Sequence, residues 1–254
     1  MTHDPQAVKL GKLPVKHDPR TFRLAKYIDK SILPVPPARV DYSTKISDWK
    51  MLANDKLGCC TCSAILHMIM LWASQSGAPV PDFTDQDAID LYSKLCGYVP
   101  GDPSTDNGGV MLDILKAWRQ APIHGCELVA FTAVDPTNWQ EVKIAHDLFG
   151  SLYSGVALPV EAQNETIWTS TSGAPGTWGG HCIPSDAYAE KGGWSCAVDL
   201  EQITWGGKQK MTPKWFAKYC DELYAPITPL WLDATGKAPN GFNIDQLKAD
   251  LAAL

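Results

Sequence analysis

The sequence predicts an α+β fold of two lobes, because its helical patterns come first along the chain and its strand patterns second. Residues 60–73 carry apolar side chains on every face of a helix, and only Ser63 and His67 among them are clearly polar. This pattern predicts a helix that is buried on all sides. After residue 150, strand-like segments separated by glycine-rich turns predominate.

The first part of the chain should hold an arm and further helices. Residues 1–35 are rich in proline and weakly periodic, so we expect an extended arm that lies on the surface. Helical patterns follow the buried helix over 84–97 and 109–120. The first of these has a defined start, because Thr84 and Asp87 have the spacing of a capping box.

The second part of the chain should be rich in strands. We expect strands within 151–160, 181–190 and 194–205. A short helix should follow them, with Thr212 as its N-cap and Pro213 at its first position.

The C-terminus predicts an amphipathic helix. Ile244, Leu247, Leu251 and Leu254 fall on one stripe of a helix, which should dock on another surface. We therefore divide the chain into four parts: an N-terminal arm (1–35), a helical lobe (36–130), a β-rich lobe (131–228) and a C-terminal extension (229–254).

Charge and composition exclude several classes of function. The 254-residue chain has a formal net charge of -6, so it lacks the basic surface that binds nucleic acid or an anionic membrane. We expect no signal peptide, because MTHDPQAVKL lacks an apolar h-region, and no apolar stretch reaches the length of a membrane span. We expect a cytoplasmic protein, or one assembled into a phage particle, whose cysteines are mostly reduced.

Three cysteines cluster where the buried helix begins, at Cys59, Cys60 and Cys62. Zinc ligands usually form pairs two to four residues apart with a second pair at a distance, and no such pair follows here. We therefore expect no metal and no cofactor. A role as small core residues suits Cys62. A thiol beside Gly58, at a helix N-terminus, suits a nucleophile, because the helix dipole and free amides lower a thiol pKa.

A nucleophilic cysteine needs a base, and His181 is the candidate. It follows two glycines and begins a predicted strand, which leaves room for a substrate beside the ring. We interpret His67 as a core residue, and His124 and His146 as surface residues. Because His181 belongs to the other lobe from Cys60, the two can meet only across a cleft.

Four segments in one order carry a resemblance to a known family: NDKLGCCTCSA, DNGGVMLDILKAW, GGHCI and ITWG. With PPARVDY, they resemble the papain-like cysteine peptidases, and most closely the bacterial and bacteriophage papain-fold proteins. The resemblance covers roughly residues 36 to 228. It implies the papain-like two-lobe fold, with a helical lobe around a buried central helix, a β-rich lobe, and a cleft between them.

The resemblance also implies catalytic roles. It makes Cys60 the nucleophile. An alignment of the cysteine cluster that is shifted by two residues would select Cys62 instead, and this alternative stays open. It makes His181 the general base. Asn54 stands where the family has a glutamine whose side-chain amide stabilises the oxyanion, and asparagine carries the same amide on a shorter stem.

The remaining matches concern substrate binding and the orientation of the histidine. Gly108 and Gly109 match a glycine pair whose backbone binds an extended substrate, and Trp205 matches a tryptophan that covers the site. In the family, an asparagine orients the imidazole. It stands two residues before the tryptophan of a Trp-Gly pair. Ile203 stands there in this chain and forms no side-chain hydrogen bond. Gln202 is nearby, but strand alternation turns it to the opposite face.

These observations predict a papain-like cysteine peptidase or related amide hydrolase that is slow because its orienting asparagine is missing. The alternative is a papain-fold structural or binding protein that has lost catalysis, such as a component of a bacteriophage particle. A peptidoglycan amidase suits the Cys-to-His spacing less well. For the leading function, we expect an extended polypeptide substrate and no nucleic acid. The arm and the C-terminal helix are candidate contacts for protein neighbours.

Overall fold

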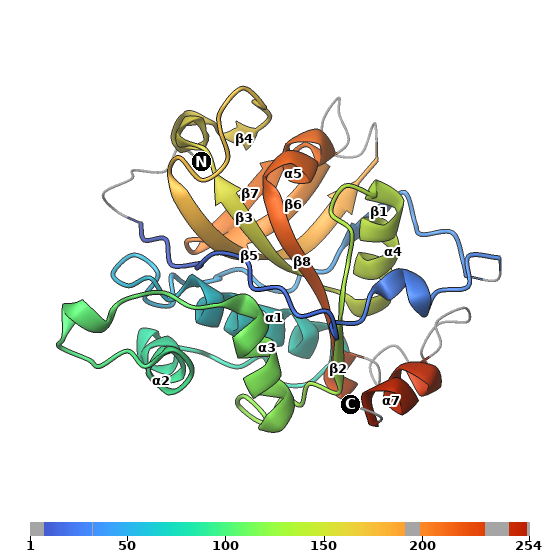
Figure 1. The fold of residues 1–254 in the computed structure, drawn as a ribbon, viewed down its shortest axis with the longest axis horizontal. Helices are drawn as coiled ribbons and strands as arrows, with labels where there is room; N and C mark the ends of the chain where they lie inside the picture. The colour runs from blue at the N-terminus through green and yellow to red at the C-terminus, as the bar shows by residue number, and fades with distance from the viewer. Residues whose placement is uncertain (1–7, 32, 191–198, 232–243, 253–254) are drawn as a thin grey trace.

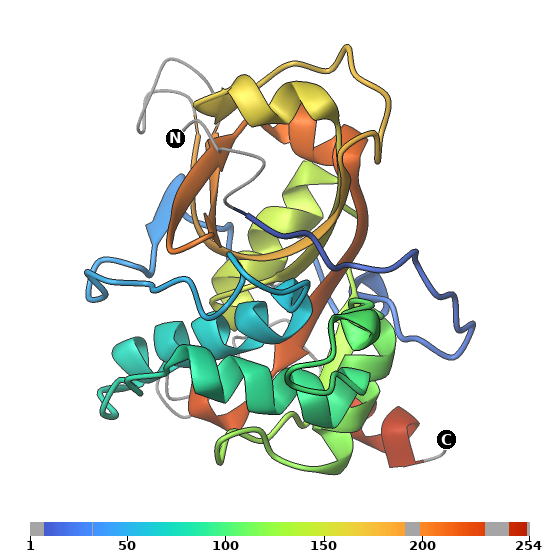
Figure 2. The ribbon, with the colours of Figure 1, turned by 90° about the vertical axis from the view of Figure 1, so that its left-hand side faces the viewer.

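A computed structural model describes residues 8–31, 33–190, 199–231 and 244–252. It confirms the α+β class and the two lobes. Helices α1, α2 and α3 gather below the sheet in Figure 1, and Figure 2 shows the same separation from the side. Each lobe has its own apolar core.

The helical lobe is built around α1 (Cys60–Ser76), which begins at the cysteine cluster and is buried from Cys60 to Ser74, as the sequence predicts. Gly77 ends it in the left-handed conformation. The other two helices are α2 (Asp85–Cys96), which has the predicted capping box, and α3 (Met111–Gln120).

The β-rich lobe is one curved sheet in which eight strands of the described chain take part. Seven follow the order β2-β8-β3-β5-β6-β7-β4, and β1 pairs with β5. The pairs are antiparallel except β4–β7. The strands are β1 (Arg39–Asp41), β2 (Ala130–Ala133), β3 (Tyr153–Leu158), β4 (Ile167–Trp168), β5 (Gly179–Ala189), β6 (Asp199–Thr204), β7 (Gly207–Met211) and β8 (Cys220–Ile227).

Further helices accompany the sheet. The α5 helix has the predicted N-cap Thr212 and Pro213 at its first position, and β8 follows it directly. The described chain also has short 3-10 helices. These elements are α4 (Trp139–Phe149), α5 (Pro213–Tyr219), η1 (Leu24–Lys26), η2 (Pro103–Thr105) and η3 (Val160–Asn164).

Helix α4 corrects one expectation. His146 was expected at the surface, but it is 0% exposed and stacks on Tyr42 at a centroid distance of 5.5 Å. Burial lowers its pKa to about 3, so it is a neutral core residue. His67 is a core residue as predicted, with Nε2 2.7 Å from the carbonyl oxygen of Trp49.

The C-terminal helix α7 (Ile244–Ala252) packs on the chain itself. Leu247 is fully buried, and the Asp250 carboxylate accepts from Lys26 at 2.6 Å and from the Tyr27 hydroxyl at 2.8 Å. The side chains of Ile244 and Leu251, and all of Leu254, lie outside what the structure describes. None of the described helices is long and apolar enough to cross a lipid bilayer.

Candidate functional site

Cys60 is the first residue of α1 and lies where the two lobes meet. The loop before it is held by Asp106, whose carboxylate accepts the Gly58 N–H at 3.0 Å. The Cys60 thiol lies near the backbone N–H of Cys182 on β5, the residue directly after His181, and this N–H favours the ionised form of the thiol. The fold thus brings the candidate nucleophile against the strand that carries the candidate base.

Burial controls the ionisation of the Cys60 thiol. It raises the pKa to about 11, while the N–H groups of Cys182 and Gly11 and the charge of Lys12 act in the opposite direction. We expected the helix N-terminus to lower this pKa. That expectation is wrong for the thiol as it lies here, because Cys60 is only 1% exposed and loss of water outweighs the amides.

The His181 ring is held by two neighbours from the end of β6. Its Nε2 lies 2.8 Å from Oγ1 of Thr204. The Trp205 indole stacks on the imidazole, with ring centroids 4.4 Å apart and planes inclined by 12°. Trp205 has a left-handed φ of 46°, which turns its indole back over the site.

Thr204 is the residue that the sequence analysis missed. Ile203 is 1% exposed and packs in an apolar core, so it takes no part in orienting the ring. Gln202 points elsewhere, as strand alternation predicts, and donates to the Ser154 hydroxyl at 3.3 Å. The sequence did hold a signal for Thr204: in ITWG, a hydroxyl residue directly follows Ile203, the position that matches the family's asparagine.

Asn54 reaches the space between the lobes despite its short side chain. Its Nδ2 donates to the carbonyl oxygens of Lys9 and Leu57, both at 3.2 Å. The Lys9 oxygen also accepts from the Trp205 indole N–H at 3.3 Å. A carbonyl oxygen is therefore already bound between Asn54 and Trp205.

The Gly108–Gly109 pair lies on the other side of the same space. Gly108 has a φ of +79° and donates its N–H to the Tyr92 hydroxyl at 2.6 Å. Gly109 bonds an extended chain through both backbone groups: its N–H donates to the Gly11 oxygen at 2.8 Å, and its oxygen accepts from Leu13 at 3.0 Å. This is the type of contact that we expected from a substrate.

The extended chain that occupies this space is the N-terminal arm. Residues 8–13 run between the lobes in both views (Figures 1 and 2), and Lys12 donates its N–H to the Gly180 oxygen at 3.0 Å. The expectation of a surface position is wrong for this stretch, since Val8 and Lys12 are buried. The physical reason is that Gly109 and Gly180 offer backbone groups that an extended chain can satisfy.

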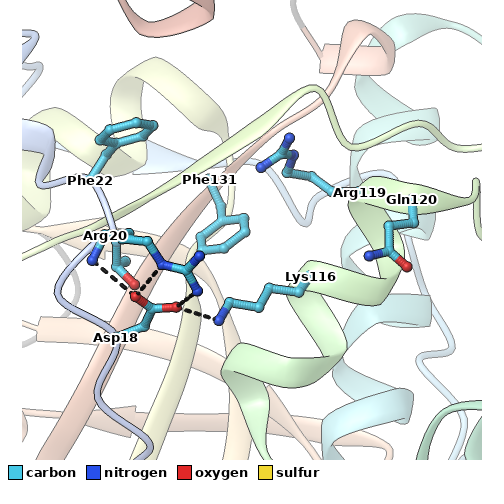
Figure 3. Close-up of a pocket in the computed structure, with 8 residues that line it drawn as sticks. Asp18, Arg20, Phe22, Lys116, Arg119, Gln120 and Phe131 are labelled. Carbon is cyan, nitrogen blue, oxygen red and sulfur yellow. Dashed lines mark hydrogen bonds and ion pairs between the residues drawn. The ribbon is translucent and has the colours of Figure 1, made fainter. Parts of the chain in front are cut away.

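Further along, the arm is fastened to α3. Asp18 accepts from Lys116 at 2.6 Å and from Arg20 at 2.7 Å, and these bonds hold the pKa of its carboxyl well below the usual value. Figure 3 shows these residues beside a cavity of about 330 Å³, to which Arg119 also contributes.

Within the described residues, no group of three or more His, Cys, Asp or Glu side chains is arranged to hold a metal ion. The thiols around α1 have protein partners instead. Cys59 lies 3.4 Å from the Ser63 hydroxyl, and Cys62 interacts with Cys96 on α2.

The chain can now be compared with known proteins. No protein-family model matches it, and no curated protein sequence matches it either. Solved structures do match. The structure is similar to xylellain, a cysteine protease from Xylella fastidiosa, with a TM-score of 0.64 and 12% identity over 87% of this chain and 97% of that chain.

Two further solved structures, a procathepsin and a protease, also match. Digestive procathepsin L 3 from Tenebrio molitor larval midgut has a TM-score of 0.57 and 11% identity, over 87% of this chain and 76% of that chain. The bromelain protease from Ananas comosus, in complex with the E64 inhibitor, has a TM-score of 0.53 and 11% identity, over 75% of this chain and 98% of that chain. At these identities the likeness concerns the fold alone. The chain therefore has the papain-like two-lobe fold.

Proposed function

We propose that this chain is a cysteine peptidase that cleaves an amide bond of an extended polypeptide, with Cys60 as nucleophile and His181 as general base. One observation carries the proposal: the Cys60 thiol, at the first residue of α1, lies against β5 at Cys182, directly beside His181. Support comes from Thr204 and Trp205, which hold the His181 ring in one orientation.

The reaction would proceed in two steps. His181 takes the Cys60 proton, and the thiolate forms a C–S bond to the substrate carbonyl carbon. The Asn54 amide and the Cys60 backbone N–H would stabilise the oxyanion, and His181 then returns the proton to the leaving amine as the C–N bond breaks. Water hydrolyses the thioester by the same route, which releases the acid and restores the thiol.

The arm makes the chain a latent form of such an enzyme. The atom of the arm that faces the Cys60 sulfur is the N–H of Gly11, and an amide proton offers the thiolate no carbon to attack. The arm also takes the backbone groups of Gly109 that a substrate would need. Residues 8–13 must therefore leave before a substrate can bind.

A single methyl group can test this proposal. A Cβ at Gly11 would lie 1.8 Å from the Gly58 backbone oxygen, so Gly11→Ala should displace the arm without altering a catalytic side chain. We expect Gly11→Ala to hydrolyse fluorogenic peptides faster than the native chain, and Gly11→Ala/Cys60→Ala to hydrolyse none. Lys30→Ala, at an exposed arm position outside residues 8–13, is the control and should behave as the native chain does.

The alternative is a papain-fold binding protein that has lost catalysis, and the observation that favours it is Ile203 in place of the family's asparagine. Under that alternative, Gly11→Ala remains folded and exposes Cys60 to alkylation, yet hydrolyses no peptide in a broad mixture. This outcome would refute the peptidase proposal.

A further inference from the structure

Lys12 is a cation that is buried between the lobes. Its side chain is 1% exposed, although lysine is among the residues least often buried without a partner. Its Nζ lies 3.0 Å from Oδ2 of Asp221 and 3.2 Å from Oε1 of Glu222. Burial alone would lower the pKa of Lys12, but the two carboxylates more than offset that effect and raise it.

The two carboxylates belong to the β-rich lobe and not to the arm. Asp221 and Glu222 are consecutive residues of β8. Glu222 is 5% exposed, and its Oε2 accepts the Tyr224 hydroxyl at 3.0 Å, so it is fixed by its own strand. The Glu222 carboxyl group is therefore held in position independently of the arm.

A glycine makes the space for the lysine stem. Gly155 on β3 pairs with Glu222 on β8. A Cβ at Gly155 would lie 2.3 Å from Cε of Lys12 and 2.7 Å from both the Glu222 side chain and the Met111 sulfur. We call the space enclosed by Gly155, Met111, Asp221 and Glu222 the Lys12 site.

The Lys12 site is placed to recognise a substrate. Lys12 is the residue between the two that bond Gly109, and its neighbour Gly11 faces the Cys60 sulfur. Any extended peptide that bonds Gly109 in the same place presents a side chain to the Lys12 site. A neutral side chain there would leave a buried carboxylate without a counter-charge, which is costly.

We propose that the Lys12 site binds a lysine or arginine side chain of the substrate, next to the cleavage point, and that the arm occupies it as a mimic. This rests on the proposed peptidase function. Lysine supplies a point charge between the carboxylates, and the planar arginine fork can bond both of them.

Peptide binding tests the inference without requiring catalysis. In Gly11→Ala, the peptide acetyl-Leu-Gly-Lys-Leu-amide should protect Cys60 from iodoacetamide. The same peptide with norleucine in place of lysine should need a concentration on the order of 10²-fold higher. Glu222→Gln should remove most of that difference, while Glu127→Gln, at an exposed position on the same chain, should preserve it. Equal protection by the two peptides, or none by either, would overturn the inference.

Turnover separates this inference from the proposed function. With matched fluorogenic substrates, the lysine and arginine forms should exceed the norleucine form in kcat/KM by a similar factor. Equal turnover of all forms refutes the inference and leaves the peptidase intact. Selective protection by the lysine peptide without any turnover refutes the peptidase, while the Lys12 site remains a binding site for basic peptides.

Discussion

At the His181 ring, orientation comes from a hydroxyl and an indole. Thr204 Oγ1 lies 2.8 Å from Nε2 and holds that ring nitrogen in place. A hydroxyl can both donate and accept, so it can follow the ring through its protonation states. The side chain of Ile203 cannot do what the family's asparagine does. The Thr204 hydroxyl supplies a hydrogen bond to the His181 ring instead.

Replacing the Thr204 hydroxyl should slow catalysis. Thr204→Val keeps the shape of the side chain and removes the bond to Nε2, so the ring spends less time in the productive orientation. We expect kcat/KM to fall about 10- to 10²-fold in the Gly11→Ala chain, measured with a fluorogenic lysine peptide.

The matched control is Thr204→Ser, which retains the hydroxyl and should retain most of the activity. Thermal unfolding of both variants shows whether a loss of activity comes from a misoriented His181 ring or from a destabilised fold. Unchanged kcat/KM in a folded Thr204→Val chain would remove Thr204 from the mechanism.

At the scale of elements, one carboxylate joins the parts of the helical lobe that form the site. Asp106 accepts the Gly58 N–H ahead of α1 and the Tyr92 hydroxyl from α2, and Tyr92 in turn accepts the N–H of Gly108. The loop before α1 and the loop at Gly108 are therefore held together by one chain of hydrogen bonds.

Breaking this chain should cost stability. Tyr92→Phe leaves the Gly108 N–H without its acceptor and removes one of the two bonds to Oδ1 of Asp106, and an unpaired buried donor costs about 1–3 kcal/mol. We expect a loss of this size in the free energy of unfolding, measured with urea. Tyr98→Phe, on a ring that stacks on Tyr92, is the control and should change stability by less than half of that amount. Equal losses in the two variants would contradict the role given to Tyr92.

At the scale of the molecule, local patterns predict the elements, and contacts between distant segments create the site. The buried helix, its neighbour with the Thr84 capping box, and the α5 start at Pro213 follow from spacing within a few residues. The position of the arm does not, because the residues around Lys12 are held by Gly109, Gly180 and Asp221, which lie far along the chain.

The same limit explains the errors at single residues. His146 lies on a helix face that looks polar in sequence, and only its packing against rings of other elements makes it buried. The pKa of Cys60 was expected to follow the helix terminus, but the arm and the second lobe exclude water from it. Burial of this kind depends on tertiary contacts that no local pattern encodes.

The central claim is that Cys60 and His181 act as a pair once the arm has left. The pH dependence of Cys60 alkylation by iodoacetamide tests it most directly, because only the thiolate reacts. In the native chain, the pKa of about 11 predicts slow alkylation at pH 7 and a rise through alkaline pH. In Gly11→Ala, we predict a reactive component below pH 8 that is absent from Gly11→Ala/His181→Ala. An alkaline rise alone, identical with and without His181, would contradict the account.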